Sequence, residues 1–289
     1  MKKFIVLLVV AVLTVPAWAD YKSTILADNP LSFWEFEDAS SADGAPCADT
    51  VGISNGIYKN RGATATGLPD ISLVAGVPGT GGKAAYFNGT GASGNGNFVD
   101  VPDSSYTVPP YRLESSTTCS IEFWEKANPT ASETYARFIS HAAGGTGNYW
   151  VGMTSTGANA GQPFVGVPGT TWYAWPPILA NNLWHLVDVV YTNDGTNTTA
   201  TLYIDALNRG SSTHAGLLTP PGAWQDLMIG AENHQTYAFN GLVGAMDEVA
   251  YYAYALDQTK VTAHFDAIPE PATITLLCLG GLALLKKRS

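Results

Sequence analysis

Two pairs of carboxylates in this 289-residue chain have spacings that bear on glycoside hydrolysis. Retaining glycosidases need two carboxyl groups about 5–5.5 Å apart, and residues i and i+2 of a strand meet this need because they share a face. Glu35 and Glu37 have this spacing, but no third carboxylate follows where such a site needs one. Glu122 and Glu125 are three apart and point to opposite sides of a strand. We therefore expect a protein that is not an enzyme.

Aromatic side chains suggest a second kind of chemistry, because the C–H faces of sugars stack on Trp and Tyr rings. The densest cluster contains Trp172, Tyr173 and Trp175, in a segment rich in Pro and Gly that indicates a surface loop. Loop aromatics have less core to fill, which favours a ligand-binding role. The alternative is that aromatic side chains fill a core. Four further candidates for sugar binding are Tyr149, Trp150, His234 and Tyr237.

The middle of the chain is acidic. Between Asp20 and Ile268 there are nine Lys and Arg against 23 Asp and Glu, a net charge of −14. This balance argues against nucleic acid as a partner, because two negative surfaces repel each other. It suits a protein that binds neutral sugars or divalent cations. The alternative is a solvated acidic surface without a specific partner.

Cys47 and Cys119 are the two cysteines of this middle part. An oxidising exterior would allow them to pair, and two small buried thiols are the alternative. The sequence has no C-x-x-C motif and no clustered histidines, so cysteine and histidine give no metal motif.

The first residues have the pattern of a secretory signal peptide. Two lysines precede an apolar stretch, and Ala17-Trp18-Ala19 fits the small-x-small cleavage pattern. We expect signal peptidase to cut after Ala19, so that Asp20 becomes the first residue. This predicts a signal peptide over 1–19 and export from the cytoplasm.

Residues 269–289 contain three parts in a fixed order. Pro269-Glu270-Pro271 breaks the chain away from what precedes it, an apolar run follows over 272–285, and a basic cluster ends the chain. This order resembles the bacterial PEP-CTERM sorting signal. The resemblance implies transient inner-membrane anchoring by a short transmembrane helix, cleavage by an exosortase, and release to the cell surface or extracellular matrix. A buried core helix is the alternative for the apolar run.

Between these segments, 20–268 has the pattern of one all-β domain. Short alternating segments are separated by turn residues. In 119–124, for example, Cys119, Ile121 and Phe123 share one face. The predicted strands cover 31–36, 84–87, 98–101, 118–127, 136–140, 149–153, 163–167, 184–191, 199–204, 227–229 and 244–252.

The remaining segments give one helix and several loops. Asp257 is placed to cap a short C-terminal helix, in which Val261 and Phe265 share a face. Residues 43–82 and 89–97 are rich in Gly, Ala, Thr and Asn and predict long surface loops.

Four groups of residues, in order, resemble the bacterial laminin G-like domain of the concanavalin A-like superfamily. They are KAAYFNG at 83–89 with FVDVP at 98–102, CSIEFWEK at 119–126, LWHLVDVVY at 183–191 with LYID at 202–205, and GAMDEV at 244–249 with AL at 255–256. The resemblance spans about 31 to 267. It implies a jelly-roll sandwich of two antiparallel sheets, closed by one short C-terminal helix.

The resemblance also implies a metal site and marks two departures. Structural calcium at the sandwich edge would involve Asp247, with Asp49 and Asn55 from an N-terminal loop as contributors. The alternative is a strand-end acid that binds loop amides. Ala206 stands where the family has Gly, which leaves open whether the usual tight turn forms. Asp188 replaces a small residue, and we expect it on an exposed sheet face.

These observations together predict an exported, non-catalytic carbohydrate-binding or adhesion protein of the cell surface or matrix. Its partner would be an extracellular polysaccharide or surface glycan. A structural matrix protein without a defined ligand is the alternative, and a glycoside hydrolase of the same superfamily is a third.

Overall fold

Strand β7 (Cys119–Ala127) shows why the chain forms packed sheets. Cys119, Ile121 and Phe123 point to one face and are buried between two sheets, while Trp124 is buried on the opposite face. An alternating strand of this kind needs a cover on each side. The second sheet covers one face of β7, and two helices cover the opposite face.

The computed structural model describes residues 20–52, 54–60, 69–80, 82–89, 96–102, 118–128, 135–143, 146–167, 170–215, 226–233 and 238–268. The signal peptide with Ala19, the sorting tail with Pro269, Glu270 and Pro271, and the candidates His234 and Tyr237 lie outside these residues. No helix of the described part is long and apolar enough to cross a membrane.

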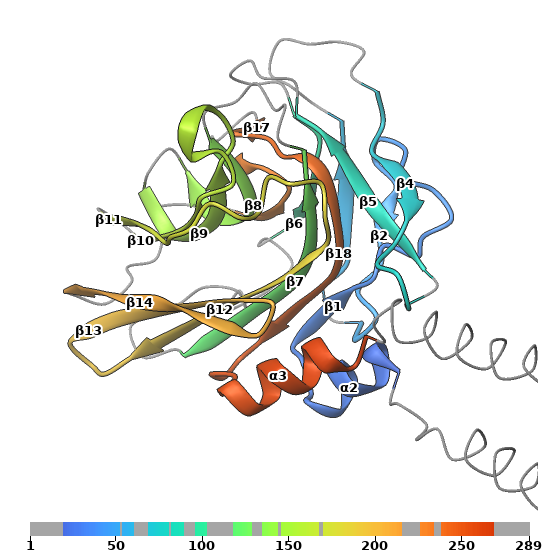
Figure 1. Cartoon of the computed structure of the whole chain (residues 1–289). Coiled ribbons are helices and arrows are strands. Elements are labelled where there is room, and N and C mark those ends of the chain that lie inside the picture. The colour runs from blue at the N-terminus through green and yellow to red at the C-terminus, as the bar shows by residue number, and fades with distance from the viewer. Residues whose placement is uncertain are drawn as a thin grey trace, which may run out of the picture.

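One sheet has eight strands, with β1 beside β18. Its order is β14 (Leu207–Ala215), β13 (Asn197–Ile204), β12 (His185–Asn193), β7, β18 (Val243–Tyr252), β5 (Lys83–Asn88) and β4 (Ser72–Ala75), and β1 spans Ser32–Trp34. The sheet curves around one side of the molecule (Figure 1).

The other sheet has ten strands. Its order is β11 (Thr170–Tyr173), β10 (Pro163–Val167), β9 (Thr146–Thr154), β8 (Tyr135–Ala143), β15 (Leu227–Ile229), β6 (Phe98–Val101), β3 (Gly56–Lys59) and β2 (Pro46–Cys47). In addition, β16 (Glu232–Asn233) pairs with β8, and β17 (Ala238–Phe239) pairs with β16. The prediction of an all-β sandwich of two antiparallel sheets is confirmed.

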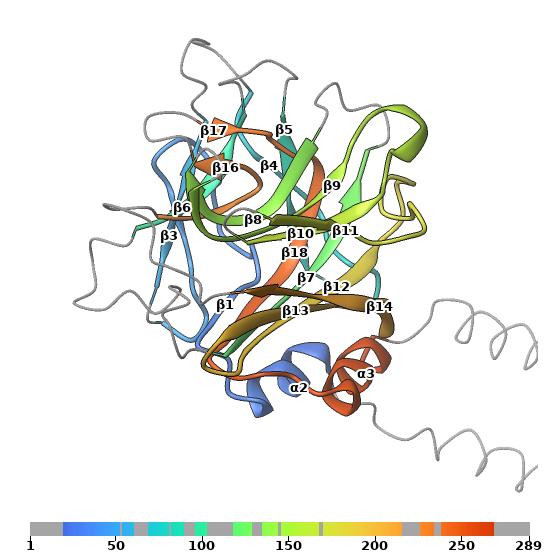
Figure 2. The ribbon, with the colours of Figure 1, turned by 90° about the vertical axis from the view of Figure 1, so that its left-hand side faces the viewer.

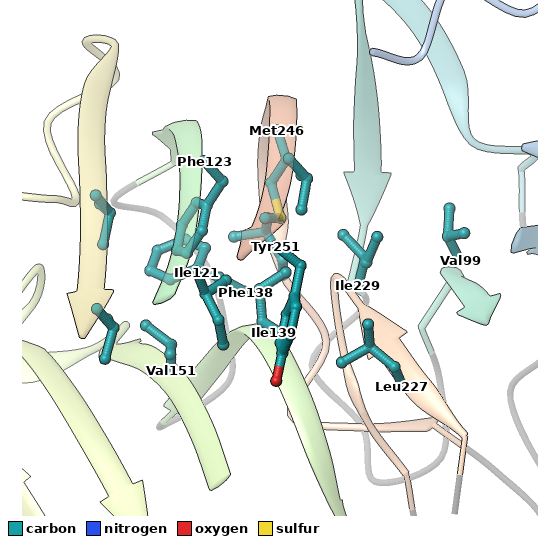
Figure 3. Packing of buried hydrophobic residues seen from close by; sticks show 14 of the residues in the cluster. Val99, Ile121, Phe123, Phe138, Ile139, Val151, Leu227, Ile229, Met246 and Tyr251 are labelled. Atoms are coloured by element: carbon teal, nitrogen blue, oxygen red, sulfur yellow. The ribbon is translucent and has the colours of Figure 1, made fainter. Parts of the chain in front are cut away.

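The core lies between the two sheets. Ile121 and Phe123 from the eight-stranded sheet face Phe138 and Val151 from the ten-stranded sheet (Figure 3). The rings of Phe123 and Phe138 lie 5.3 Å apart between centroids, so the two layers interlock directly.

Each predicted strand coincides with an observed one, and the structure adds strands where the sequence indicated loops. β2, β3 and β4 lie within 43–82, and Trp172 and Tyr173 lie on β11 instead of in a loop. These strands are short or lie near sheet edges. Such positions need little apolar alternation, so the sequence carries little signal for them.

Two helices cover the outer face of the eight-stranded sheet (Figures 1 and 2). Helix α3 (Gln258–Asp266) is the predicted one, and Asp257 caps it by accepting a hydrogen bond from the Lys260 backbone N–H at 2.9 Å. Helix α2 (Tyr21–Ala27) corrects the expectation of a single helix. It has no side-chain cap and only seven residues, so tertiary packing of Tyr21 and Ile25 must stabilise it.

A buried polar network joins both helices to the sheet. Glu122 on β7 accepts a hydrogen bond from the Tyr21 hydroxyl at 2.7 Å and contacts Nδ1 of His264 at 2.6 Å. The other ring nitrogen of His264 lies 3.0 Å from Asp28. Burial raises the pKa of Glu122, but the His264 charge lowers it, and the net effect is a lowering. Burial lowers the pKa of His264, but the carboxylates of Glu122 and Asp28 raise it, and the net effect is a rise.

Asp188 corrects a second expectation. It lies opposite Glu122 on β12 and is fully buried beneath the helices, not exposed. Burial and then the Glu122 charge raise the pKa of Asp188 well above its usual range. The expectation of exposure was wrong because it did not include the helices that cover this face.

The two cysteines are separate buried thiols. Cys47 lies on β2 of the ten-stranded sheet, whereas Cys119 lies on β7 of the other sheet. The structure therefore supports the buried-thiol alternative over pairing.

The hairpin between β13 and β14 forms a tight two-residue turn despite lacking glycine. Ile204 pairs with Leu207, and Asp205 and Ala206 have φ values of 52° and 59°. Both central residues of such a turn need positive φ, which L-residues with a side chain adopt at a cost. Ala206 is therefore a strained position.

We predict that Ala206→Gly stabilises the protein by about 1 kcal/mol, because glycine adopts positive φ freely. Urea unfolding measures this change. Ala200→Gly, on the regular strand β13, is the matched control and should lose stability instead. Equal losses in the two variants would contradict strain at Ala206.

Candidate functional site

An aromatic and arginine cluster lies on the outer face of the ten-stranded sheet, where β8 to β11 lie side by side (Figure 2). We call it the β8–β11 patch. Inward-facing Val151 and Val165 alternate with outward-facing residues along β9 and β10. The outward-facing side chains of the patch are Tyr135, Arg137, Trp150, Phe164 and Tyr173.

Two glycines make room for the large rings of this patch. Gly166 is the cross-strand partner of Trp150, and a Cβ atom there would come within 1.7 Å of the indole. Gly152 is the partner of Phe164, and its Cβ would lie 2.6 Å from that ring. The rings of Trp150 and Phe164 therefore lie over glycines, which have no side chain, and both rings are buried.

Arg137 occupies the centre of the patch. Its guanidinium carbon lies 4.6 Å from the ring centroid of Phe164 and 5.8 Å from the centroids of Tyr135 and Trp150, within cation–π range. Its Nε donates to Glu232 at 3.0 Å. The same carboxylate oxygen accepts the Asn240 side-chain amide at 2.8 Å, so the pair is held in one orientation.

Two tyrosines expose the edge of the patch to solvent. Tyr135 is 37% exposed and Tyr173 is 41% exposed. Burial and the neighbouring Tyr135 hydroxyl raise the pKa of Tyr173, while Arg137 lowers it. The two hydroxyl groups and the guanidinium therefore lie close together, on a surface that combines aromatic faces with hydrogen-bonding groups.

The structure separates the aromatic residues that the sequence grouped together. Tyr173 points outward into the patch, but Trp172 points to the inner side and packs against the core. Trp175 lies in the loop after β11 and is 66% exposed. Trp150 belongs to the patch, whereas Tyr149 is buried in the core, 5.5 Å from the ring of Tyr191.

The sequence did not single out Tyr135, Arg137, Phe164 or Glu232. The signal for two of them was the alternation in the predicted strands 136–140 and 163–167, since their outward-facing positions hold Arg137 and Phe164. Tyr135 lies just before the first of these predicted strands. Glu232 had no such signal, because β16 is a two-residue strand that only the folded sheet brings beside β8.

Asp49 and Asn55, the predicted contributors to a calcium site, tie their own loop together. Asp49 accepts hydrogen bonds from the backbone N–H groups of Phe33, Val51 and Ser54 at 2.8, 3.0 and 2.9 Å. Asn55 accepts one from the Asp49 backbone at 2.9 Å. These side chains anchor the N-terminal loop to β1.

Asp247 binds amides in the same way, at a bulge in β18. Its two oxygens accept the backbone N–H groups of Val77 and Glu248, both at 2.9 Å. Burial raises the pKa of Asp247 to about 8. The two N–H donors oppose this rise, and the charges of Glu37 and Glu35 add to it. Burial and Asp247 raise the pKa of Glu248 to about 9. Several carboxylates therefore lie close together here.

The hydrogen bonds of Asp49, Asn55 and Asp247 match the amide-binding alternative. Within the described ranges, no group of three or more His, Cys, Asp or Glu is arranged to hold a metal ion. We therefore assign these side chains a structural role as amide acceptors. Calcium binding at this edge stays a prediction.

Three of the four carboxylates considered for hydrolysis have structural contacts. Glu122 binds Tyr21 and His264 beneath the helices, and Glu125 is buried on the opposite face of β7. Glu35 pairs with Lys22 at 2.8 Å, while Glu37 accepts a hydrogen bond from the Lys83 backbone at 2.5 Å. Glu35, Glu37 and Glu122 thus have structural contacts, and Glu125 is buried.

Comparison with known families then identifies the domain. Residues 93–262 match the family model Laminin G 3, described as the concanavalin A-like lectin/glucanases superfamily, over more than half of the chain. The chain belongs to this superfamily. Because that description includes both lectins and glucanases, membership of the superfamily shows the fold but not whether the protein is an enzyme, which must be argued from its residues. No curated protein matches the sequence.

Solved structures of low sequence identity share the fold. Domain 4 of AbnA, a GH43 extracellular arabinanase from Geobacillus stearothermophilus in complex with arabinotriose, is 20% identical, with a TM-score of 0.51 over 82% of this chain and 97% of that one. Trypanosoma rangeli sialidase is 11% identical, with a TM-score of 0.53 over 81% of this chain and 32% of that one. The binding domain of Paraclostridial Mosquitocidal Protein 1 is 13% identical, with a TM-score of 0.53, covering 84% and 53%. This chain thus spans about a third of the sialidase.

We predict that Asp247→Ala lowers the unfolding free energy by roughly 1–3 kcal/mol, because two buried backbone N–H groups lose their acceptor. Chemical denaturation measures the loss. Asp194→Ala is the matched control, since Asp194 accepts two backbone N–H groups in an exposed turn where water can replace it. Its loss should be smaller.

The same measurement with and without chelator tests calcium. The amide role predicts the same loss in both conditions. A chelator effect on the wild type that disappears in Asp247→Ala would instead show a bound cation.

Proposed function

We propose that the protein is an exported, non-catalytic carbohydrate-binding or adhesion protein of the cell surface or extracellular matrix. The observation that carries the proposal is the β8–β11 patch, in which two half-exposed tyrosines flank an arginine on a rigid sheet face. Sugars bind to such surfaces through ring stacking and a few fixed polar groups. The partner is an extracellular polysaccharide or a surface glycan.

Two features support sugar binding over purely structural packing. Tyr173 and Trp175 are 41% and 66% exposed, so their rings remain available to a ligand. The acidic middle part of the chain also favours a neutral ligand over an anionic one. The similarity to the arabinotriose-bound domain is in fold, and we extend it to sugar binding only as part of this proposal.

The structural matrix protein without a ligand remains the second candidate, and the glycoside hydrolase the third. The described contacts of Glu35, Glu37 and Glu122 favour a protein that is not an enzyme. A structural protein would retain the patch as packing alone and would bind no glycan.

Sorting is the other part of the proposal. The order of Pro269-Glu270-Pro271, apolar run and basic cluster supports processing by an exosortase after a transient inner-membrane stage. The signal peptide pattern before Asp20 supports export and cleavage by signal peptidase.

A polysaccharide array with the mature protein tests glycan binding. We expect saturable binding that weakens severalfold, up to about tenfold, in Tyr173→Ala, because one ring contact contributes about 0.5–1.5 kcal/mol. Trp175→Ala tests the neighbouring loop. Leu207→Ala, 59% exposed on the β13–β14 hairpin of the other sheet, is the matched control and should bind normally. An array without any binding would favour the structural alternative.

A variant with Ala-Ala-Ala at 269–271 tests sorting. We expect the uncut protein to stay in the inner membrane, because the processing enzyme loses its recognition sequence. Cell fractionation with mass measurement detects this. Release of the variant at the normal mature size would show that the tripeptide has no sorting role.

A further inference from the structure

The ion pair in the β8–β11 patch has a property that simple packing does not require. Arg137 and Glu232 form a buried pair, with 12% and 4% of their side chains exposed. A buried ion pair adds little stability compared with apolar residues of the same size. Its orientation is nevertheless fixed from two sides, since Asn240 binds Glu232 by its side chain and the Arg137 backbone N–H by its carbonyl at 2.9 Å.

The pair leaves part of the guanidinium group available. Among the described residues, Glu232 is the hydrogen-bond partner of the Arg137 side chain, through Nε. The Arg137 side chain is 12% exposed, and its two terminal amino groups have no partner among the described residues, so their N–H donors can serve solvent or a ligand. The rings of Phe164, Tyr135 and Trp150 surround the guanidinium carbon at 4.6 to 5.8 Å, so the donors are confined by packing and need little ordering on binding.

The opposite charges of Arg137 and Glu232 favour a neutral ligand over an anionic one. A carboxylate ligand would gain from Arg137 but would lie close to the buried charge of Glu232, in a domain with a net charge of −14. A neutral sugar has no such penalty. Two adjacent hydroxyl oxygens match the parallel N–H donors of a guanidinium fork, while the sugar face packs on Tyr135 and Tyr173.

We propose, on the basis of the proposed glycan-binding function, that Arg137 recognises a neutral sugar unit with two adjacent hydroxyl groups. Its terminal amino groups donate to the two oxygens. Glu232 acts as a positioning residue that orients the fork and excludes uronates. The patch is thereby a site for neutral glycans.

Isothermal titration calorimetry with the mature protein tests this inference. The neutral probes are β-1,4-mannohexaose, cellohexaose and xylohexaose, and the acidic probe is β-1,4-mannuronohexaose. Mannohexaose and mannuronohexaose share linkage and length and differ in the carboxylate. We expect a neutral hexasaccharide to bind, and mannohexaose to bind more tightly than its uronate counterpart. Preference for the uronate, or failure of all three neutral probes, would overturn the proposal.

Two variants separate recognition from folding. Arg137→Lys keeps the charge opposite Glu232 but loses the planar fork, and should weaken neutral-glycan binding about tenfold, the effect of one hydrogen bond to a charged group. Glu232→Gln should reduce the discrimination against mannuronohexaose. Arg209→Lys on β14 is the matched control and should bind as the wild type does. Near-ultraviolet circular dichroism confirms that each variant is folded.

The outcomes distinguish this inference from the function on which it rests. If the wild type binds a glycan and Arg137→Lys binds it equally well, the role of Arg137 is wrong and glycan binding stands. If neither the array nor the hexasaccharides show binding, glycan binding itself fails. A lower melting temperature in Arg137→Lys with unchanged affinity would assign Arg137 to packing and overturn the inference.

Discussion

The structure depends on burying both faces of the central strands β7, β12 and β18. Their inner faces pack against the ten-stranded sheet, and their outer faces carry Trp124, Leu186 and Tyr252, which are also buried. A sheet that is apolar on both faces is unstable in water unless a second layer covers it. Helices α2 and α3 provide this layer, so the ends of the described domain complete its core.

This cover explains the polar network beneath the helices. A buried carboxylate such as Glu122 is costly unless it is paired, and its partners Tyr21 and His264 come from the two helices. Asp188 opposite it lies in the same low-dielectric environment, where its neutral form is favoured. The network therefore specifies how the helices dock, in addition to the apolar contacts.

The outer face of the ten-stranded sheet has the opposite character. Across β8 to β11 it carries aromatic rings and the Arg137–Glu232 pair, with Tyr135 and Tyr173 reaching solvent. The glycines opposite Trp150 and Phe164 let the rings lie on the sheet. One face of this sheet thus builds the core, and its other face carries the patch on which the proposed function rests, in a fold that belongs to a superfamily of lectins and glucanases.

The sequence was sufficient to predict the sandwich, because period-2 alternation places side chains on opposite faces whatever surrounds the strand. It also determined the capped helix after Asp257, a local interaction. It could not place Asp188, whose burial depends on helices remote in the chain, or join Arg137 to Glu232, which are 95 residues apart. The outward orientation of Tyr173 and the inward orientation of Trp172 depend on the folded sheet, because strand β11 exists through its pairing with β10, and that pairing sets the face of each side chain.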